Sequence, residues 1–107
     1  MKRGDVVVCA MSGDDGKPRP AVVIQSDLFN PTHASIVVCP ITSHIVEAPL
    51  FRMDIPSNSE TGLKKDSQVM VDKLTAIRAD RIESSIGSLG IKQREVLDKA
   101  VRLWLNV

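Results

Sequence analysis

Residues 17–27 read KPRPAVVIQSD, and residues 37–43 read VVCPITS. In each segment a polar cluster borders an apolar, β-branched run of the kind that forms buried strands. Arg19 comes just before the first run, while Thr42 and Ser43 come just after the second. If the two strands pair in one sheet, the guanidinium and the two hydroxyls converge on one site. Such a site suits an anion, and phosphate is the natural candidate.

Short strands separated by turns dominate the rest of the chain. Apolar or alternating runs predict strands at 6–10, 21–25, 35–41, 51–55, 68–73 and 85–89, with a compact turn at 27–32 and a short helical turn at 79–82. A final helix begins after Gly90, which serves as its N-cap, and Gln93 follows three residues later. This helix carries a broad apolar stripe of Val96, Leu97, Ala100, Val101, Leu103 and Trp104. The pattern is mainly β with a C-terminal helix (α+β), and it predicts a small antiparallel barrel or sheet with the helix packed on it.

Length and composition limit the possible functions. The 107 residues form one domain, 1–107, which is long enough to bury a core. A net charge of +1 argues against a general nucleic-acid coat, although it allows a local basic patch. With Phe29, Phe51 and Trp104 as its aromatic residues, the chain is not expected to bind single strands on a row of rings. The charged start at Met1 to Asp5 resembles neither a signal peptide nor a membrane span, so we expect a cytoplasmic location without membrane contact.

The cysteines and histidines give no sign of metal or redox chemistry. Cys9 and Cys39 lie in apolar runs, so we expect buried thiols in a reducing compartment, with a disulfide between neighbouring strands as the alternative. His33 and His44 lack metal-ligand spacing, and no acidic cluster resembles a magnesium site. No glycine-rich phosphate loop precedes a helix. We therefore expect neither a metal nor a cofactor.

Several motifs together resemble one known family. They are RGDVV at 3–7, RPAVVI at 19–24, PITS at 40–43, TGLKKDS at 61–67, DKL at 72–74 and RI at 81–82. In this order, and over nearly the whole chain, they look like the MazF/PemK (Kid) family of toxin endoribonucleases. The resemblance implies a single toxin domain with an SH3-like β-barrel of the MazF/CcdB type and attached helices.

The resemblance also implies an activity and partners. Family members form homodimers and cut single-stranded RNA, usually messenger RNA, at short sequences without a metal. An antitoxin holds them inactive by laying an extended, acidic tail in the RNA groove. Contact with DNA is expected only indirectly, through a toxin–antitoxin complex.

Metal-free RNA cleavage uses the ribose 2′-hydroxyl as nucleophile and leaves a cyclic phosphate. It needs a proton acceptor, a proton donor and a cation beside the pentacovalent phosphorane. Arg19 matches the family's catalytic arginine and Thr42 its catalytic threonine. The planar, permanently charged guanidinium suits the phosphorane. The residues expected to contact the substrate are Ser43, Lys17, Phe51, Gln68, Asp72 and His44, with Asp72 accepting hydrogen bonds from a base edge.

The chain departs from the family pattern in two places. Some members carry a histidine in the first loop, which here reads SGDDG at 12–16, and some carry an arginine where this chain has Met70. The general acid and base therefore stay open; His44 is either a titratable group of the site or an exposed loop histidine. We also expect the acidic first loop to point away from an RNA groove.

Two alternative functions remain at this point. One is a DNA gyrase poison of the CcdB type, a family that shares the fold and acts through a tryptophan near its C-terminus. Trp104 occupies such a place, although its position in the apolar stripe favours core or dimer packing. The other alternative is a degenerate family member that binds RNA or antitoxin without cutting RNA.

Overall fold

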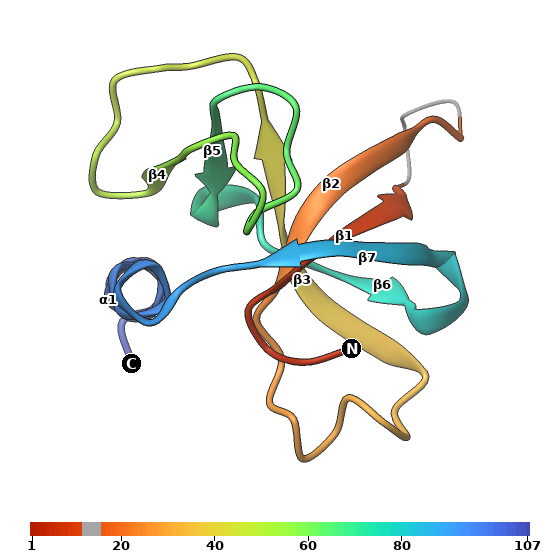
Figure 1. Cartoon of the computed structure of the whole chain (residues 1–107). Coiled ribbons are helices and arrows are strands. Elements are labelled where there is room, and N and C mark those ends of the chain that lie inside the picture. Colours follow the sequence, from red (N-terminus) through yellow and green to blue (C-terminus); the bar gives the residue numbers. More distant parts are fainter. Residues whose placement is uncertain (12–15) are drawn as a thin grey trace.

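A computed structural model describes residues 1–11 and 16–107. The expectation about the acidic first loop falls mainly on residues 12–15, which lie outside the described part. In the described residues seven antiparallel strands form one strongly bent sheet, with a single α-helix at one side (Figure 1). The strands are β1 (Asp5–Ala10), β2 (Pro18–Val23), β3 (Ser35–Thr42), β4 (Arg52–Ile55), β5 (Ser67–Met70), β6 (Thr75–Arg78) and β7 (Ile82–Ser88).

The strand order is β4-β5-β3-β2-β1-β7, and β6 also pairs with β3. Because β3 pairs with β2, β5 and β6, the sheet folds over on itself into a barrel-like shape that does not close completely. This agrees with the predicted barrel-like, mainly β fold. The helix α1 (Ile91–Leu105) lies beside the small β4-β5 part of the sheet.

The central strands are buried on both faces, as their continuous apolar runs predict. One core lies on the face that α1 and β4 cover, and it contains Val6, Val22, Cys39, Ile41, Met53, Ile55, Val69, Val71, Leu89 and Leu97. The other core lies on the opposite face, and it contains Val7, Cys9, Ala21, Val23, Ile36 and Val38. The two cysteines thus lie in different cores, and the disulfide alternative is wrong for the described residues.

Two predicted strands need correction, and one strand was missed. The strand predicted at 68–73 ends at Met70, because a 3₁₀ turn, η1 (Val71–Lys73), follows it. The last strand is longer than predicted, and β6 at Thr75–Arg78 was not predicted at all. The short helical turn near residue 80 is confirmed as the 3₁₀ turn η2 (Ala79–Arg81).

The helix α1 begins and ends with the capping chemistry that its sequence indicates. The Gln93 side chain accepts a hydrogen bond from the Gly90 N–H at 2.9 Å, and Asn106 ends the helix in the left-handed conformation, with φ 58°. Of the predicted apolar stripe, Leu97 is buried, but Val96, Leu103 and Trp104 are 53%, 59% and 47% exposed. The chain therefore covers only part of its own helix.

Arg3 ties the start of the chain to α1. Its Nε donates to the Ile24 carbonyl at 3.0 Å, and its Nη2 forms an ion pair with Asp98 at 2.8 Å. The Arg3 N–H donates to the Asp27 carboxylate at 2.7 Å, which lowers the pKa of that group. These contacts join the first residues to the turn after β2 and to the last element of the fold.

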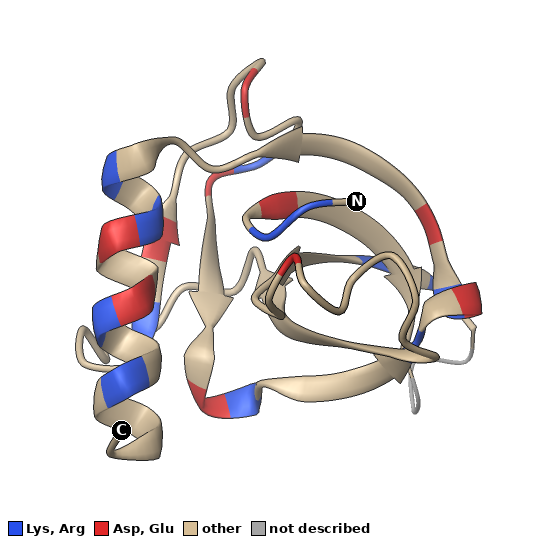
Figure 2. Ribbon diagram, turned by 90° about the horizontal axis from the view of Figure 1, so that it is seen from below, with Lys and Arg blue, Asp and Glu red and all other residues tan. Residues whose placement is uncertain are grey.

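Charged residues of both signs lie along α1 and are scattered over the strands and turns (Figure 2). This distribution agrees with the net charge of +1. Within the described residues, no helix has the length and apolar character needed to cross a membrane.

Candidate functional site

Arg19 and Thr42 lie at the same end of the sheet. β2 and β3 pair antiparallel, with Ala21 opposite Pro40. The β2–β3 pairing ends at this pair; Arg19 is the second residue of β2, opposite Cys9 of β1, and Thr42 is the last residue of β3, opposite Gln68 of β5. Strand alternation then places both side chains on the face that carries Val38 in the second core.

Thr42 also closes a local turn. Its Oγ1 accepts a hydrogen bond from the His44 N–H at 3.1 Å, an arrangement typical of hydroxyl residues after strands. A hydroxyl has two lone pairs and one proton, so this contact leaves the proton available for a further acceptor. Ser43 and His44 are exposed beside it, and Lys17 is exposed just before β2.

Gln68 extends the same face onto the neighbouring strands, because it pairs with both Thr42 and Asp54. Its side chain is nevertheless buried, and its amide is committed within the protein. Nε2 donates to the Val46 carbonyl at 2.8 Å and to Asp54 Oδ1 at 2.9 Å, while Oε1 accepts from the Val46 N–H at 3.1 Å. Gln68 thus holds the segment between β3 and β4 over the sheet.

Asp72 lies on η1 rather than on the predicted strand, and its carboxylate is paired. Arg52 donates from Nε to Oδ1 at 2.9 Å and from Nη2 to Oδ2 at 3.3 Å, and the two side chains are only 12% and 17% exposed. A planar fork on a carboxylate in this environment is a strong, oriented contact. Access of a base edge to Asp72 would have to compete with this pair.

Sequence reasoning missed Arg52. It occupies an outward position of the alternating run at 51–55, and its register partner in β5 is Met70. Arg52 therefore lies across from Met70, the position where some members of the family named above have an arginine. Its outward position in the alternating run weakly indicated that Arg52 was available for a polar contact. The strand register that brings it to Asp72 cannot be derived from the sequence.

Phe51 lies apart from the other predicted site residues. Its half-buried ring packs against the first core and contacts Trp104, with centroids 5.6 Å apart and planes tilted by 48°. Both rings therefore belong to the contact between the sheet and α1. The structure brings Arg19, Lys17, Thr42, Ser43 and His44 to one end of β2 and β3, sets Gln68 and Asp72 on the adjoining elements, and leaves Phe51 at the helix.

The buried thiol of Cys39 is poorly suited to catalysis. Burial raises the pKa of Cys39 to about 12, so its thiol stays protonated and poorly nucleophilic near neutral pH. Among the described residues, no group of three or more His, Cys, Asp and Glu side chains could hold a metal ion. The described side chains named above at the end of β2 and β3 supply a guanidinium, two hydroxyls, an amine and an imidazole.

Comparison with known families gives a match over almost the entire chain. The family model described as "PemK-like, MazF-like toxin of type II toxin-antitoxin system" matches residues 2–105. A protein of Mycolicibacterium smegmatis named "Probable endoribonuclease MazF" is 36% identical over 108 residues, covering 100% of this chain and 98% of the relative. "Endoribonuclease EndoA" of Bacillus subtilis is 28% identical over 109 residues, covering 98% and 94%.

Solved structures share the fold at low sequence identity. The "Mycobacterium tuberculosis toxin MazF-mt6" has a TM-score of 0.83 at 19% identity, covering 96% of this chain and 97% of the other. The MazE–MazF complex of Deinococcus radiodurans has a TM-score of 0.82 at 19% identity, covering 100% and 96%. An "Endoribonuclease in complex with its cognate antitoxin from Mycobacterial species" has a TM-score of 0.82 at 18% identity, covering 100% and 96%.

Proposed function

Because the chain belongs to the family of PemK-like, MazF-like toxins of type II toxin–antitoxin systems, we propose that it is a metal-independent endoribonuclease. Its substrate is single-stranded RNA, chiefly messenger RNA, which it cuts at a short sequence in the cytoplasm. The observation that carries the proposal is the antiparallel pairing of β2 with β3, because it brings the start of β2, which holds Arg19, and the end of β3, which holds Thr42, to the same end of the sheet. The curated relatives named as endoribonucleases support the same activity.

The cleavage step follows from the groups at this end of the sheet. The ribose 2′-oxygen bonds to phosphorus, and its proton passes to a general base. The bond from phosphorus to the 5′-oxygen of the next nucleotide breaks, and this oxygen takes up a proton from a general acid. Arg19 stabilises the negative charge that builds up on the phosphorane oxygens. The Thr42 oxygen already accepts a hydrogen bond from the His44 N–H, so its hydroxyl can donate a hydrogen bond to a phosphate oxygen.

The test is cleavage of labelled single-stranded RNA by the purified protein in EDTA. We expect cuts at a defined sequence, with a cyclic phosphate at the new 3′ end. Arg19→Ala should lower the rate on the order of 100-fold or more, because one charged donor at the phosphorane is lost. Arg78→Ala, at an exposed arginine of β6, serves as the matched control and should cleave normally.

Two results would overturn the proposal. One is cleavage that requires an added divalent metal, and the other is full activity of Arg19→Ala. Binding of RNA without any cleavage would instead favour the degenerate family member. The CcdB-like alternative has no support from the family model or from the relatives described above.

We further propose that an antitoxin restrains this activity with an extended acidic segment laid over the ends of β2 and β3. Solved relatives in complex with their antitoxins support this partner. The basic groups Lys17 and Arg19 and the exposed His44 supply the complementary charge and donors. Purified toxin should lose RNA cleavage when the acidic segment of its antitoxin is added.

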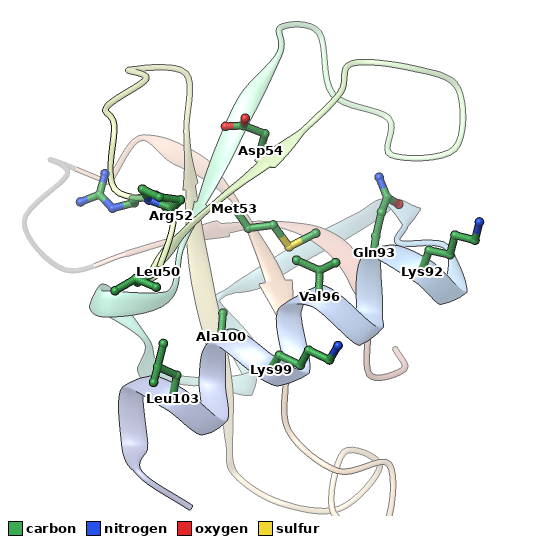
Figure 3. A pocket seen from close by; sticks show the side chains of 11 residues that line it. Leu50, Arg52, Met53, Asp54, Lys92, Gln93, Val96, Lys99, Ala100 and Leu103 are labelled. Atoms are coloured by element: carbon green, nitrogen blue, oxygen red, sulfur yellow. The ribbon is translucent and has the colours of Figure 1, made fainter.

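We also propose that the protein is a homodimer joined through α1. A cleft of about 560 Å³ lies between α1 and β4, and Figure 3 shows Val96, Ala100 and Leu103 of the helix facing it across from Leu50 and Met53. Leu50 and Leu103 are 67% and 59% exposed. A second copy of the chain would cover this apolar surface, which is continuous with the uncovered part of the helix.

A further inference from the structure

A second cleft, of about 480 Å³, lies beside the ends of β2 and β3. Its walls are largely apolar and include Val8 of β1, Pro20 of β2, and Leu63 and Ile86. Lys64 and Lys65, both exposed, stand in the segment that forms its other side. The cleft therefore combines an apolar slot with two cations at its rim.

This cleft adjoins the proposed cleavage site directly in the chain. Pro18 and Pro20, which line the cleft, are the two neighbours of Arg19, and Ser43, which also lines it, follows Thr42. Strand alternation sets Pro20 on the opposite face of β2 from Arg19. An RNA strand that crosses the exposed start of β2 therefore meets the guanidinium on one side and the cleft on the other.

The wall that carries the lysines is preformed. Thr61 Oγ1 donates to the Pro56 carbonyl at 2.8 Å, and Asn58 Oδ1 accepts from the Glu60 and Thr61 N–H groups, each at 2.9 Å. At the other end of the wall, Asp66 Oδ1 accepts from the N–H and the hydroxyl of Ser57 at 2.8 and 2.9 Å.

Close packing against β7 fixes this wall further. Gly62 has φ +71°, and a Cβ there would lie 2.0 Å from the Ile86 carbonyl oxygen. The Ser88 N–H donates to the Glu60 carbonyl at 2.8 Å. A wall fixed in this way binds a ligand without the cost of ordering a loop.

Building on the proposed function, we propose that this cleft binds one nucleotide of the RNA that flanks the cleaved bond. The base lies against Pro20, Leu63 and Ile86, and the adjacent phosphates pair with Lys64 and Lys65. A base has apolar faces and its phosphate a full charge, so a nucleotide matches the cleft in both respects. The cleft then sets which base is accepted beside the cut, a role that Phe51, Gln68 and Asp72 are poorly placed to fill because they are engaged within the protein.

The proposed pairing of Lys64 and Lys65 with phosphates is tested by RNA binding, measured by fluorescence anisotropy over a range of salt concentrations. The RNA lacks the 2′-hydroxyl at the mapped cleavage position, so it binds without being cut. Lys64→Gln/Lys65→Gln should weaken binding on the order of tenfold at low salt and reduce the log–log salt slope by about 1.4, since each phosphate on a single strand contributes about 0.7. Lys2→Glu, at an exposed lysine outside the cleft, makes the same change in net charge and should leave the slope unchanged.

The proposed binding of a base in the cleft is tested by letting the protein cleave a randomised RNA pool and sequencing the new ends. Val8→Phe fills the cleft, and Ile86→Ala enlarges it. We expect each to change the base preference at one position beside the cut, while thermal unfolding shows that both variants remain folded. Unchanged preferences at every position in two folded variants would overturn the proposal.

The outcomes separate this inference from the proposed function. If the wild-type protein cleaves no RNA, the proposed function fails, and the salt slope with unmodified RNA still reports whether the cleft binds nucleotides. If the protein cleaves RNA but the double lysine variant binds and cuts like wild type, only the cleft proposal fails. If that variant loses affinity for polyglutamate and not for RNA, the cleft is assigned to an acidic protein partner instead.

Discussion

At the scale of single residues, the most informative contact is the pair of Arg52 and Asp72. Both side chains are largely buried, so the energy of the pair depends on two hydrogen bonds replacing two lost hydration shells. Removing one partner leaves the other charge buried without compensation. The pair therefore orients the start of η1 beside β5 more than it adds net stability.

We predict that Asp72→Asn and Arg52→Met each lower the free energy of unfolding by about 3–5 kcal/mol, as breaking a buried pair typically does. Urea unfolding followed by circular dichroism measures this loss. Arg78→Ala breaks the highly exposed pair with Asp80 and should cost less than about 1 kcal/mol. Equal, small losses in all three variants would show that the Arg52 pair is no more important than a surface contact.

At the scale of secondary-structure elements, the loop between β4 and β5 depends on glycine at Gly62. Two effects act there: a positive φ that other residues rarely adopt, and contact with the backbone of β7. Gly16 has a similar φ of +74°, but no atom of the described residues lies within 4 Å of the added Cβ. The two positions thus separate backbone strain from close packing.

Gly16→Ala should destabilise the protein by about 1 kcal/mol through strain alone. Gly62→Ala should cost clearly more, at least about 3 kcal/mol, because the Ile86 carbonyl must also move. Thermal and urea unfolding of the two variants give the comparison. Equal losses would mean that the loop yields to the added Cβ and is not a fixed wall.

The elements also show how far sequence patterns reach. The β-branched runs of β1 and β3 and the capped, striped helix α1 were predictable because each carries its signal locally. β6 reads TAIR, is mostly exposed, and becomes a strand through pairing with β3, which no local pattern indicates. In the same way, Gln68 was predicted to contact RNA. Its side chain instead forms hydrogen bonds with the backbone of Val46, 22 residues away, and such a tertiary contact has no local sequence signal.

At the scale of the whole molecule, the chain leaves an apolar helix surface that one copy does not cover. Stable interfaces bury roughly 800 Å² on each partner, and α1 with Leu50 provides a suitable centre for one. The two proposed RNA-binding features lie at the ends of β2 and β3, whereas the proposed dimer surface lies along α1 and β4. Dimer formation and RNA binding can therefore be tested separately.

We predict a dimer at micromolar concentration by light scattering or sedimentation. Leu103→Glu places a charge in the proposed interface and should give folded monomers. Leu28→Glu, at another exposed leucine in the turn after β2, is the matched control and should remain dimeric. A monomeric wild-type protein, or dissociation by both substitutions alike, would contradict the proposed interface.

The contacts of Arg3 have a consequence for synthesis of the chain. β1 pairs with β7, and Arg3 meets Asp98 on α1, so the first strand completes its contacts only with the last elements. A nascent chain on the ribosome lacks these partners until β7 and α1 have been made, because distant pairing forms late. We expect a force-profile measurement with arrest peptides to show folding only when α1 has left the exit tunnel. The growing toxin would then stay inactive until α1 has emerged from the ribosome.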